Sequence, residues 1–296
     1  MSFLGELSAL FTAFLWSASS MVFAAATKQA GSFQVNITRL ILAAVYLVSF
    51  ITLIGLDIRM SGAQILYLGI SGVIGLSLGD TFLFKAFQEL GARISMLIMS
   101  IAPAIAAVLA YVVLDESLST VGVLGIVITV SGIAIVVLDR STVDSKQILI
   151  TPSGIAYGVL AAVGQGAGLV LAKMAFREGG LDGFVATAVR IIASLVVLLP
   201  VAVMTKRFRN PYRMFNDQRK AFWLTAVGSV LGPFLGISFS LMAIEYTKVG
   251  IAATIMAIVP ILMLPMVRFV YKEKLTWRAI LGACAAVTGV ALLFLR

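Results

Sequence analysis

The stretch Gly75-Leu-Ser-Leu-Gly79 returns 157 residues later as Gly232-Pro-Phe-Leu-Gly236. At this constant shift, residues 72–139 align with residues 229–296 without a gap, and about 20 of the 68 aligned positions are identical. Self-similarity at one fixed offset is the signature of a chain built from repeated units. The sequence therefore predicts two copies of one structural unit.

The composition indicates that both copies lie in a membrane. Hydrophobic residues make up 61% of the chain, charged residues only 12%, and the mean hydropathy is +1.09. A soluble domain is about half apolar and about a quarter charged, and about 20 apolar residues suffice for a transmembrane helix. Ten spans are predicted, at residues 3–26, 34–55, 64–88, 93–114, 120–138, 154–175, 182–204, 221–244, 249–270 and 276–295. The predicted fold class is an all-α integral membrane protein with ten transmembrane helices.

The number of spans per copy predicts how the copies are related. We expect residues 1–140 to form a first five-helix repeat, residues 141–153 a connecting loop and residues 154–296 a second five-helix repeat. Because five is odd, the second copy must enter the membrane upside-down, which gives an inverted repeat with both termini on one side. Inverted repeats of this kind are typical of secondary transporters.

Charge and residue usage exclude several function classes. The net charge is +9, but the basic residues lie in short loops between spans, so nucleic-acid binding is not expected. Most of them follow the odd-numbered spans, which predicts that those loops are cytoplasmic and both termini are outside. Histidine is absent and Cys284 is the only cysteine, so we expect no metal, no cofactor and no disulfide. No phosphate-binding loop and no nucleophile–base pair is found, so an ATP-driven pump and an enzyme are not expected.

The matched glycines predict close helix contacts. Gly75 and Gly79 in the third span, and Gly232 and Gly236 in the eighth, have the spacing that lets two helix backbones approach in a membrane. The alternative is that these glycines line a surface that slides during transport.

Pro103 and Pro260 form a second matched pair, inside the predicted fourth and ninth spans. A proline within a helix leaves the carbonyl four residues earlier without its usual donor. We expect a hinge or kink at both sites, and direct contact with substrate is the alternative.

These motifs, taken together, resemble the drug/metabolite transporter superfamily, specifically its EamA-type ten-helix members. In each repeat a glycine-rich helix leads through the proline-bearing helix to a short acidic turn, Asp115-Glu116-Ser117-Leu118-Ser119 and Lys272-Glu273-Lys274-Leu275-Thr276. The resemblance covers the whole chain and implies transport of a small solute, but it does not identify the solute. It also implies cytoplasmic termini in the cytoplasmic (inner) membrane, opposite to the charge pattern. The membrane-embedded glutamate that small multidrug relatives carry in the first helix has no counterpart here, because Glu6 lies near the end of that helix and Trp16 at its centre.

Asp80 is the leading ionisable candidate within a span, and such groups are functional by default. Its repeat partner is Ile237, so the two halves differ chemically at this point. Asp80 is expected either to take up a coupling proton or face a cation, or to form a structural ion pair with Lys85, Arg93 or Arg39. Lys85 is five residues away, about 140° around the helix, which argues against that pair.

Arg39 and Arg190 fall on matched sites in the second and seventh spans once one loop-length change is allowed. One interpretation is that their side chains extend to the lipid headgroups. The other is that they clamp a carboxylate or phosphate with the planar donor fork of arginine.

Polar and aromatic residues on otherwise apolar spans are candidates for the lining of a substrate cavity. They are Trp16, Ser17 and Ser20 on one face of the first span, Gln165 within a glycine-rich stretch, and Phe84, Met96, Phe239 and Met256 as an adaptable apolar wall. Ordinary packing between helices is the alternative for each.

The sequence therefore predicts a secondary active transporter, in the export direction, of a small organic metabolite such as an amino acid or a derivative. Alternating access is expected, coupled to protons or run as an exchange. The expected partners are a small-molecule substrate, protons and the lipid bilayer, and the sequence gives no oligomeric state. A flippase for lipid-linked sugars and a non-transporting membrane scaffold remain the alternatives.

Overall fold

The computed structural model describes residues 3–114, 120–138, 151–205, 208, 210–246, 252, 255–270 and 276–294. The two acidic turns and most of the predicted connecting loop 141–153 lie outside these residues. The described elements are α1 (Leu4–Ala30), α2 (Ser32–Ile54), α3 (Gly62–Gly72), η1 (Val73–Gly79), α4 (Asp80–Met99), α5 (Ala102–Leu114), α6 (Thr120–Leu138), α7 (Pro152–Arg177), α8 (Gly183–Thr205), α9 (Pro211–Asp217), α10 (Arg219–Ser229), η3 (Val230–Gly236), α11 (Ile237–Tyr246), α13 (Val259–Val270) and α14 (Trp277–Phe294).

The predicted all-helical membrane fold is confirmed. Six helical segments are long and apolar enough to span a membrane, and further apolar helices are shorter. No strand occurs among the described elements. The predicted total of ten spans stays a prediction.

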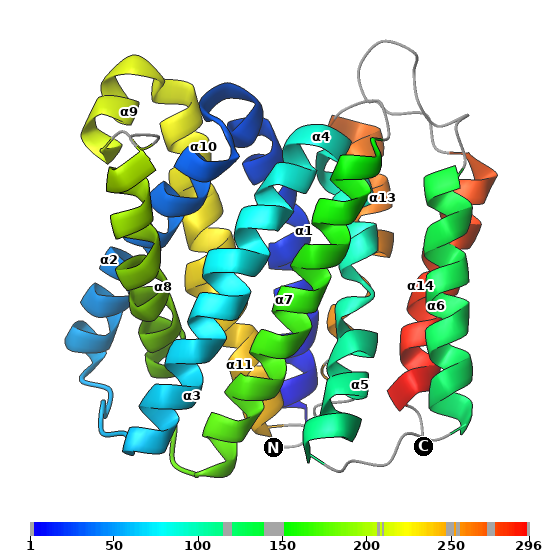
Figure 1. The fold of residues 1–296 in the computed structure, drawn as a ribbon, viewed down its shortest axis with the longest axis horizontal. Helices are drawn as coiled ribbons and strands as arrows, with labels where there is room; N and C mark the ends of the chain where they lie inside the picture. Colours follow the sequence, from blue (N-terminus) through cyan, green and yellow to red (C-terminus); the bar gives the residue numbers. More distant parts are fainter. Residues whose placement is uncertain are drawn as a thin grey trace.

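The two halves run in opposite directions (Figure 1). The start of α1 and the end of α14 lie at the same end of the bundle, whereas α9 lies at the other end. Helix α7, which opens the second half, runs antiparallel to α1, as an inverted repeat requires.

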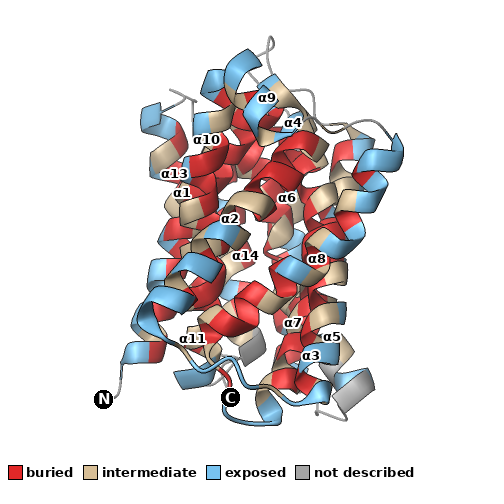
Figure 2. Cartoon of the chain, turned by 90° about the vertical axis from the view of Figure 1, so that its left-hand side faces the viewer, coloured by how far each residue is buried: buried red, intermediate tan, exposed pale blue. Residues whose placement is uncertain are grey.

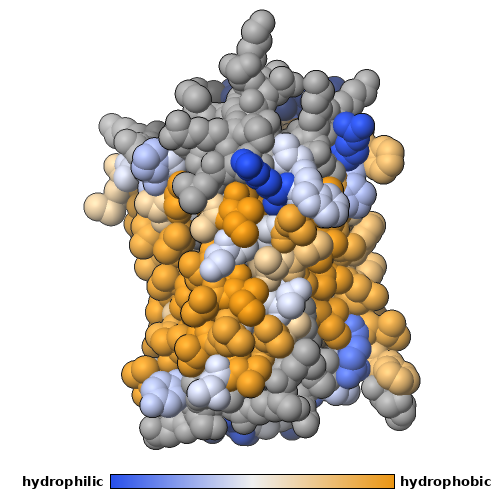
Figure 3. All heavy atoms as spheres, turned by 90° about the vertical axis from the view of Figure 1, so that its right-hand side faces the viewer, coloured by the Kyte–Doolittle hydropathy of each residue, from blue (hydrophilic) through white to orange (hydrophobic). Residues whose placement is uncertain are grey.

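The surface shows how the bundle meets its surroundings. Buried residues fill the interior along the helices (Figure 2), and an apolar band covers the side of the molecule between more hydrophilic ends (Figure 3). Large apolar side chains such as Leu53 and Val203 are 84% and 72% exposed. Exposed apolar side chains are costly in water and suit contact with lipid tails.

At both prolines the expected hinge or kink takes the form of a break in the helix. The chain leaves the helix at Ser100 and Ile101, and α5 begins at Ala102, so Pro103 is its second residue. Pro260 is likewise the second residue of α13. Proline is tolerated in the first turn of a helix. Backbone N–H groups there have no acceptor within the helix, so no hydrogen bond is lost when proline lacks one. The helix is therefore interrupted before each proline rather than bent at it.

The glycine motifs lie in π-helical segments that occupy the same place in both repeats. Segments η1 and η3 are seven residues long and start 157 residues apart, at Val73 and Val230. Each closes with a backbone hydrogen bond across five residues, from the Asp80 N–H to the Gly75 carbonyl and from the Ile237 N–H to the Gly232 carbonyl. Single π turns inside helices are frequent at functional sites.

Each π segment packs against the first helix of the opposite repeat. A Cβ placed on Gly164 of α7 would lie 2.7 Å from the Gly79 Cα, and one on Gly236 would lie 2.7 Å from the Trp16 ring in α1. The expected close packing at these glycines is therefore present. It joins the two repeats rather than neighbouring helices of one repeat.

Helices α6 and α14 cross with the same symmetry. A Cβ on Gly282 would lie 2.6 Å from the Gly132 carbonyl oxygen, and one on Gly289 would lie 2.5 Å from the Gly125 carbonyl oxygen. These four glycines are two matched pairs of the repeat. Small residues let the two backbones touch, which is how helices associate in lipid.

Candidate functional site

A cavity of about 180 Å³ lies between the two repeats. Twelve of the residues singled out from the sequence line it: Trp16, Ser20, Arg39, Asp80, Phe84, Met96, Pro103, Gln165, Arg190, Gly232, Met256 and Pro260. They come from α1, α2, α4, α5, α7, α8, η3 and α13, except Met256, which lies just before α13. The cavity therefore draws its walls from both halves of the chain.

The remaining candidates do not line this cavity. The Ser17 hydroxyl is fully buried, donates to the Ala13 carbonyl at 2.7 Å and lies 3.5 Å from the Val259 carbonyl. Phe239 packs edge-on against Phe11 and Phe184, with ring centroids 5.1 and 6.1 Å apart. Gly79 and Gly236 serve the helix contacts described above, and a Cβ on Gly168 of α7 would lie 3.3 Å from the Gly75 Cα.

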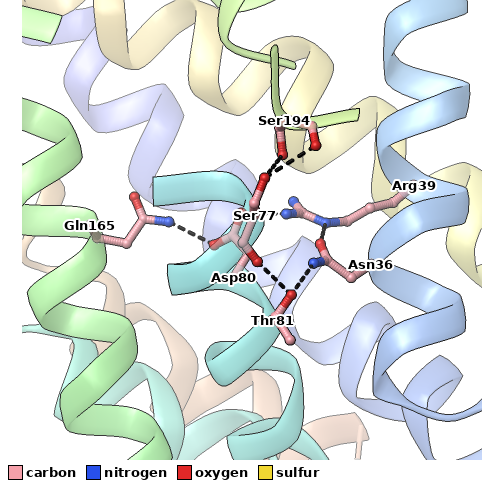
Figure 4. Close-up of polar contacts among 7 residues, drawn as sticks. All are labelled: Asn36, Arg39, Ser77, Asp80, Thr81, Gln165 and Ser194. Carbon is pink, nitrogen blue, oxygen red and sulfur yellow. Dashed lines mark hydrogen bonds and ion pairs between the residues drawn. The ribbon is translucent and has the colours of Figure 1, made fainter. Parts of the chain in front are cut away.

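Asp80 is held between the two repeats (Figure 4). It is the first residue of α4, directly after η1, and both its carboxylate oxygens are bound. One oxygen forms an ion pair with the Arg39 guanidinium from α2. The other accepts a hydrogen bond of 2.6 Å from the Gln165 side-chain amide of α7. Of the three ion-pair partners considered from the sequence, Asp80 therefore pairs with Arg39.

A neighbouring amide fixes the orientation of Arg39. The Asn36 side-chain oxygen accepts a 3.0 Å hydrogen bond from Arg39 Nε, and its amide nitrogen donates to Thr81 Oγ1 at 2.9 Å. The Phe84 ring lies 4.7 Å from the Arg39 guanidinium carbon. Asn36 was not singled out from the sequence, although its position three residues before Arg39 on one helix face was an available signal.

Arg190 has a different environment from its repeat equivalent. Its side chain borders the cavity from α8 and is 5% exposed. Its Nε is buried and has no hydrogen-bond partner within the described part of the chain. Both Arg39 (4% exposed) and Arg190 lie inside the helix bundle, so the expectation that they extend to the lipid headgroups is wrong.

Part of the cavity wall is aromatic. Trp16, Phe23, Phe84 and Phe87 line it, and the Phe23 and Phe84 rings pack with centroids 5.0 Å apart. Phe23 was not among the candidates chosen from the sequence. Its position seven residues after Trp16, and so on the same face of α1, was an available signal. Ser19 and Ser240 also line the cavity, and no pattern in the sequence identified Ser240.

The arrangement suits binding rather than reaction chemistry. Two guanidinium groups and one carboxylate face a mostly apolar space among the described lining residues. No group of three metal-ligating side chains occurs in the described part of the chain.

Comparison with known proteins gives three findings. The EamA-like transporter family matches residues 3–138 and 152–295, one match in each half. A solved crystal structure of a protein is similar over 99% of this chain and 96% of its own, with a TM-score of 0.67 and 16% sequence identity, which shows a shared fold. The comparison with curated proteins gave no significant match.

Proposed function

The chain belongs to the EamA-like transporter family, and on this premise we propose that it exports a small organic metabolite, such as an amino acid or a derivative, across the cytoplasmic membrane. It does so as a secondary transporter that works by alternating access. The family is one of membrane transporters. The substrate class, the direction and the energy source are the parts that we add.

The observation that carries the proposal is the placement of the cavity between two inverted halves. Transporters built from inverted repeats bind their substrate at the repeat interface and expose it to either side by rocking one half against the other. The cavity of about 180 Å³ is smaller than the roughly 300–1,000 Å³ of sites for drug-sized ligands. A small metabolite therefore fits better than a large drug.

The interruptions before Pro103 and Pro260 support a rocking motion. Both prolines line the cavity, and each follows a break in a helix at the same position of its repeat. A helix break concentrates a change of backbone angles in few residues. Two equivalent breaks that border one cavity give each half its own hinge.

We assign the coupling proton to Asp80. It is 3% exposed and is the one carboxylate among the described cavity residues. Protonation would remove its charge and weaken its ion pair with Arg39, so a proton and the conformation of the Asp80–Arg39 pair are linked. Weakly buffered detergent solution gives a direct test: solute binding should change the pH of a wild-type solution, and Asp80→Asn should abolish that change. An equal pH change in both proteins would remove Asp80 from this role.

Transport itself is tested by exchange in proteoliposomes. Vesicles containing the purified protein are loaded with single amino acids, N-acetyl amino acids or aromatic acids, and uptake of the labelled solute is measured against protein-free vesicles. We expect exchange for a subset of these solutes. No exchange for any of them, with the protein folded, would contradict the proposed function.

A further inference from the structure

The repeat places two arginines at equivalent positions and gives only one of them an anion. Arg39 of the first repeat is neutralised by Asp80. At the position equivalent to Asp80 the second repeat has Ile237, which also lines the cavity. Arg190 therefore lacks the carboxylate that its repeat equivalent has.

Asp80 is near enough to Arg190 to act on its charge, but it does not form an ion pair with it. Both oxygens of Asp80 are already bound, by Arg39 and Gln165. The Arg190 side chain forms no ion pair within the described residues, and its Nε lies buried without a hydrogen bond. A buried charge without a partner is unfavourable. The described groups around the cavity thus carry two positive charges and one negative charge.

The absence of a side chain at Gly75 gives the Arg190 side chain space to reach the cavity. A Cβ on Gly75 would lie 3.2 Å from Arg190 Nη2 and 3.9 Å from the Gln165 side-chain oxygen. The glycine in η1 therefore makes room for the guanidinium beside the Asp80–Gln165 contact.

We propose that Arg190 binds the carboxylate of the transported solute, and that the solute is an organic monoanion with an apolar, aromatic-sized body. The carboxylate takes the place that Asp80 takes for Arg39, and the body lies against Trp16, Phe23 and Phe84. The single negative charge of such a solute balances the excess positive charge that Arg39, Arg190 and Asp80 together give the cavity. A free ammonium group would find no unoccupied carboxylate among the described lining residues, and a dianionic phosphate ester would leave an excess charge. This inference rests on the proposed function and narrows its substrate from amino acids to derivatives or other organic acids without a free ammonium group.

The test uses four probes that share one ring and differ in charge: phenylacetate, phenylalanine, phenethylamine and phenyl phosphate. Binding to the purified full chain in detergent is measured by calorimetry. We expect phenylacetate to bind most tightly. Tighter binding of phenylalanine, phenethylamine or phenyl phosphate would overturn the inference, and so would the absence of binding by phenylacetate.

Three variants test the role of Arg190. Arg190→Gln should weaken phenylacetate binding by about 30-fold or more, because loss of one partner of a buried charge pair is expensive. Ile237→Asp supplies an internal carboxylate at the position equivalent to Asp80 and should weaken phenylacetate binding comparably while raising the melting temperature. Ile237→Asn, of matched size but neutral, separates the effect of the new charge from the loss of the Ile237 side chain and should weaken binding less than Ile237→Asp. Unchanged affinity in both Arg190→Gln and Ile237→Asp would contradict the inference.

Exchange in proteoliposomes separates the two proposals. Exchange of phenylalanine or phenethylamine without exchange of phenylacetate would overturn the monoanion and leave the transport function in place. If none of the wider set of solutes is exchanged, the transport function fails, whatever the binding series shows.

Discussion

Gln165 of the second repeat donates a 2.6 Å hydrogen bond to Asp80 of the first, so the ionised group at the centre of the bundle is held across the interface between the repeats. The ion pair that the same carboxylate forms with Arg39 lies within the first repeat. Asp80 thus links an ion pair within one half to a contact between the halves.

The first prediction concerns this linkage. Asp80→Asn should destabilise the protein by about 3–5 kcal/mol, because it leaves the buried Arg39 charge without its anion. Gln165→Leu should cost less, about 1–3 kcal/mol, since it leaves one carboxylate oxygen without a donor. Gln88→Ala, at an exposed position of the same helix, should be neutral within about 0.5 kcal/mol. Thermal unfolding in detergent ranks the three, and a loss for Gln165→Leu that exceeds the loss for Asp80→Asn would contradict the prediction.

The second prediction concerns the contact between η1 and α7. Gly164→Ala should be strongly destabilising, because its Cβ would meet the Gly79 backbone at 2.7 Å and the Ile74 carbonyl oxygen at 3.0 Å. Backbone cannot move aside as a side chain can. Gly69→Ala is the matched control, because its Cβ would have only one neighbour, the Ala193 Cβ at 3.9 Å. The control should be neutral or stabilising by up to about 1 kcal/mol. Equal melting temperatures of the two variants would show that the contact is looser than described.

The third prediction concerns Trp16 and the shape of the cavity. A Cβ on Gly236 would lie 2.7 Å from Trp16 Cδ1 and Nε1, so Gly236→Ala should displace the indole. In a background with Trp223 and Trp277 replaced by Phe, the emission spectrum of Trp16 should shift and solute binding should weaken several-fold. Gly62→Ala, with open space around its Cβ, serves as the control. An unchanged Trp16 spectrum in Gly236→Ala would count against this geometry.

The fourth prediction concerns a polar contact between the middle of α4, just before Gly91, and the start of α7. Glu89 accepts hydrogen bonds from Thr151 at 2.5 Å and Ser153 at 2.6 Å, and Thr151 also caps α7 by accepting from the Gly154 N–H at 3.0 Å. Thr151→Val removes both functions of that hydroxyl and should lower the free energy of unfolding by about 1–2 kcal/mol. Thr151→Ser keeps the hydroxyl and should retain most of the stability. Ser153→Ala, at an exposed site, should cost less than Thr151→Val, and the reverse order of melting temperatures would refute the capping role.

The repeat made much of the fold predictable, because an offset of 157 residues fixes which segments are equivalent. The odd number of expected spans per copy then required an inverted arrangement. The π-helical form of η1 and η3 was not predictable from the glycine spacing, which suits an α-helix equally well. A hinge or kink was expected at Pro103 and Pro260, but not that a new helix would start just before each proline, because proline is compatible with a kink and with a helix start.

The candidate site was less predictable for a geometric reason. Spacing along one helix defines a face but not the element that the face meets. Ser17 and Ser20 were therefore treated alike, although Ser20 borders the cavity and Ser17 faces the Val259 carbonyl. The choice of Arg39 over Arg93 as the partner of Asp80 likewise depends on how α2 and α4 pack. Residue spacing within one helix does not predict how that helix packs against another.

The two π segments also give the two halves one backbone shape with unlike chemistry. Both halves have the wide turn at the same aligned position, from Val73 and from Val230. The residue that follows the turn, Asp80 in one half and Ile237 in the other, differs. The symmetry of the backbone thus does not extend to its charge, and the same wide turn leads to an ionisable side chain in one half and an apolar one in the other.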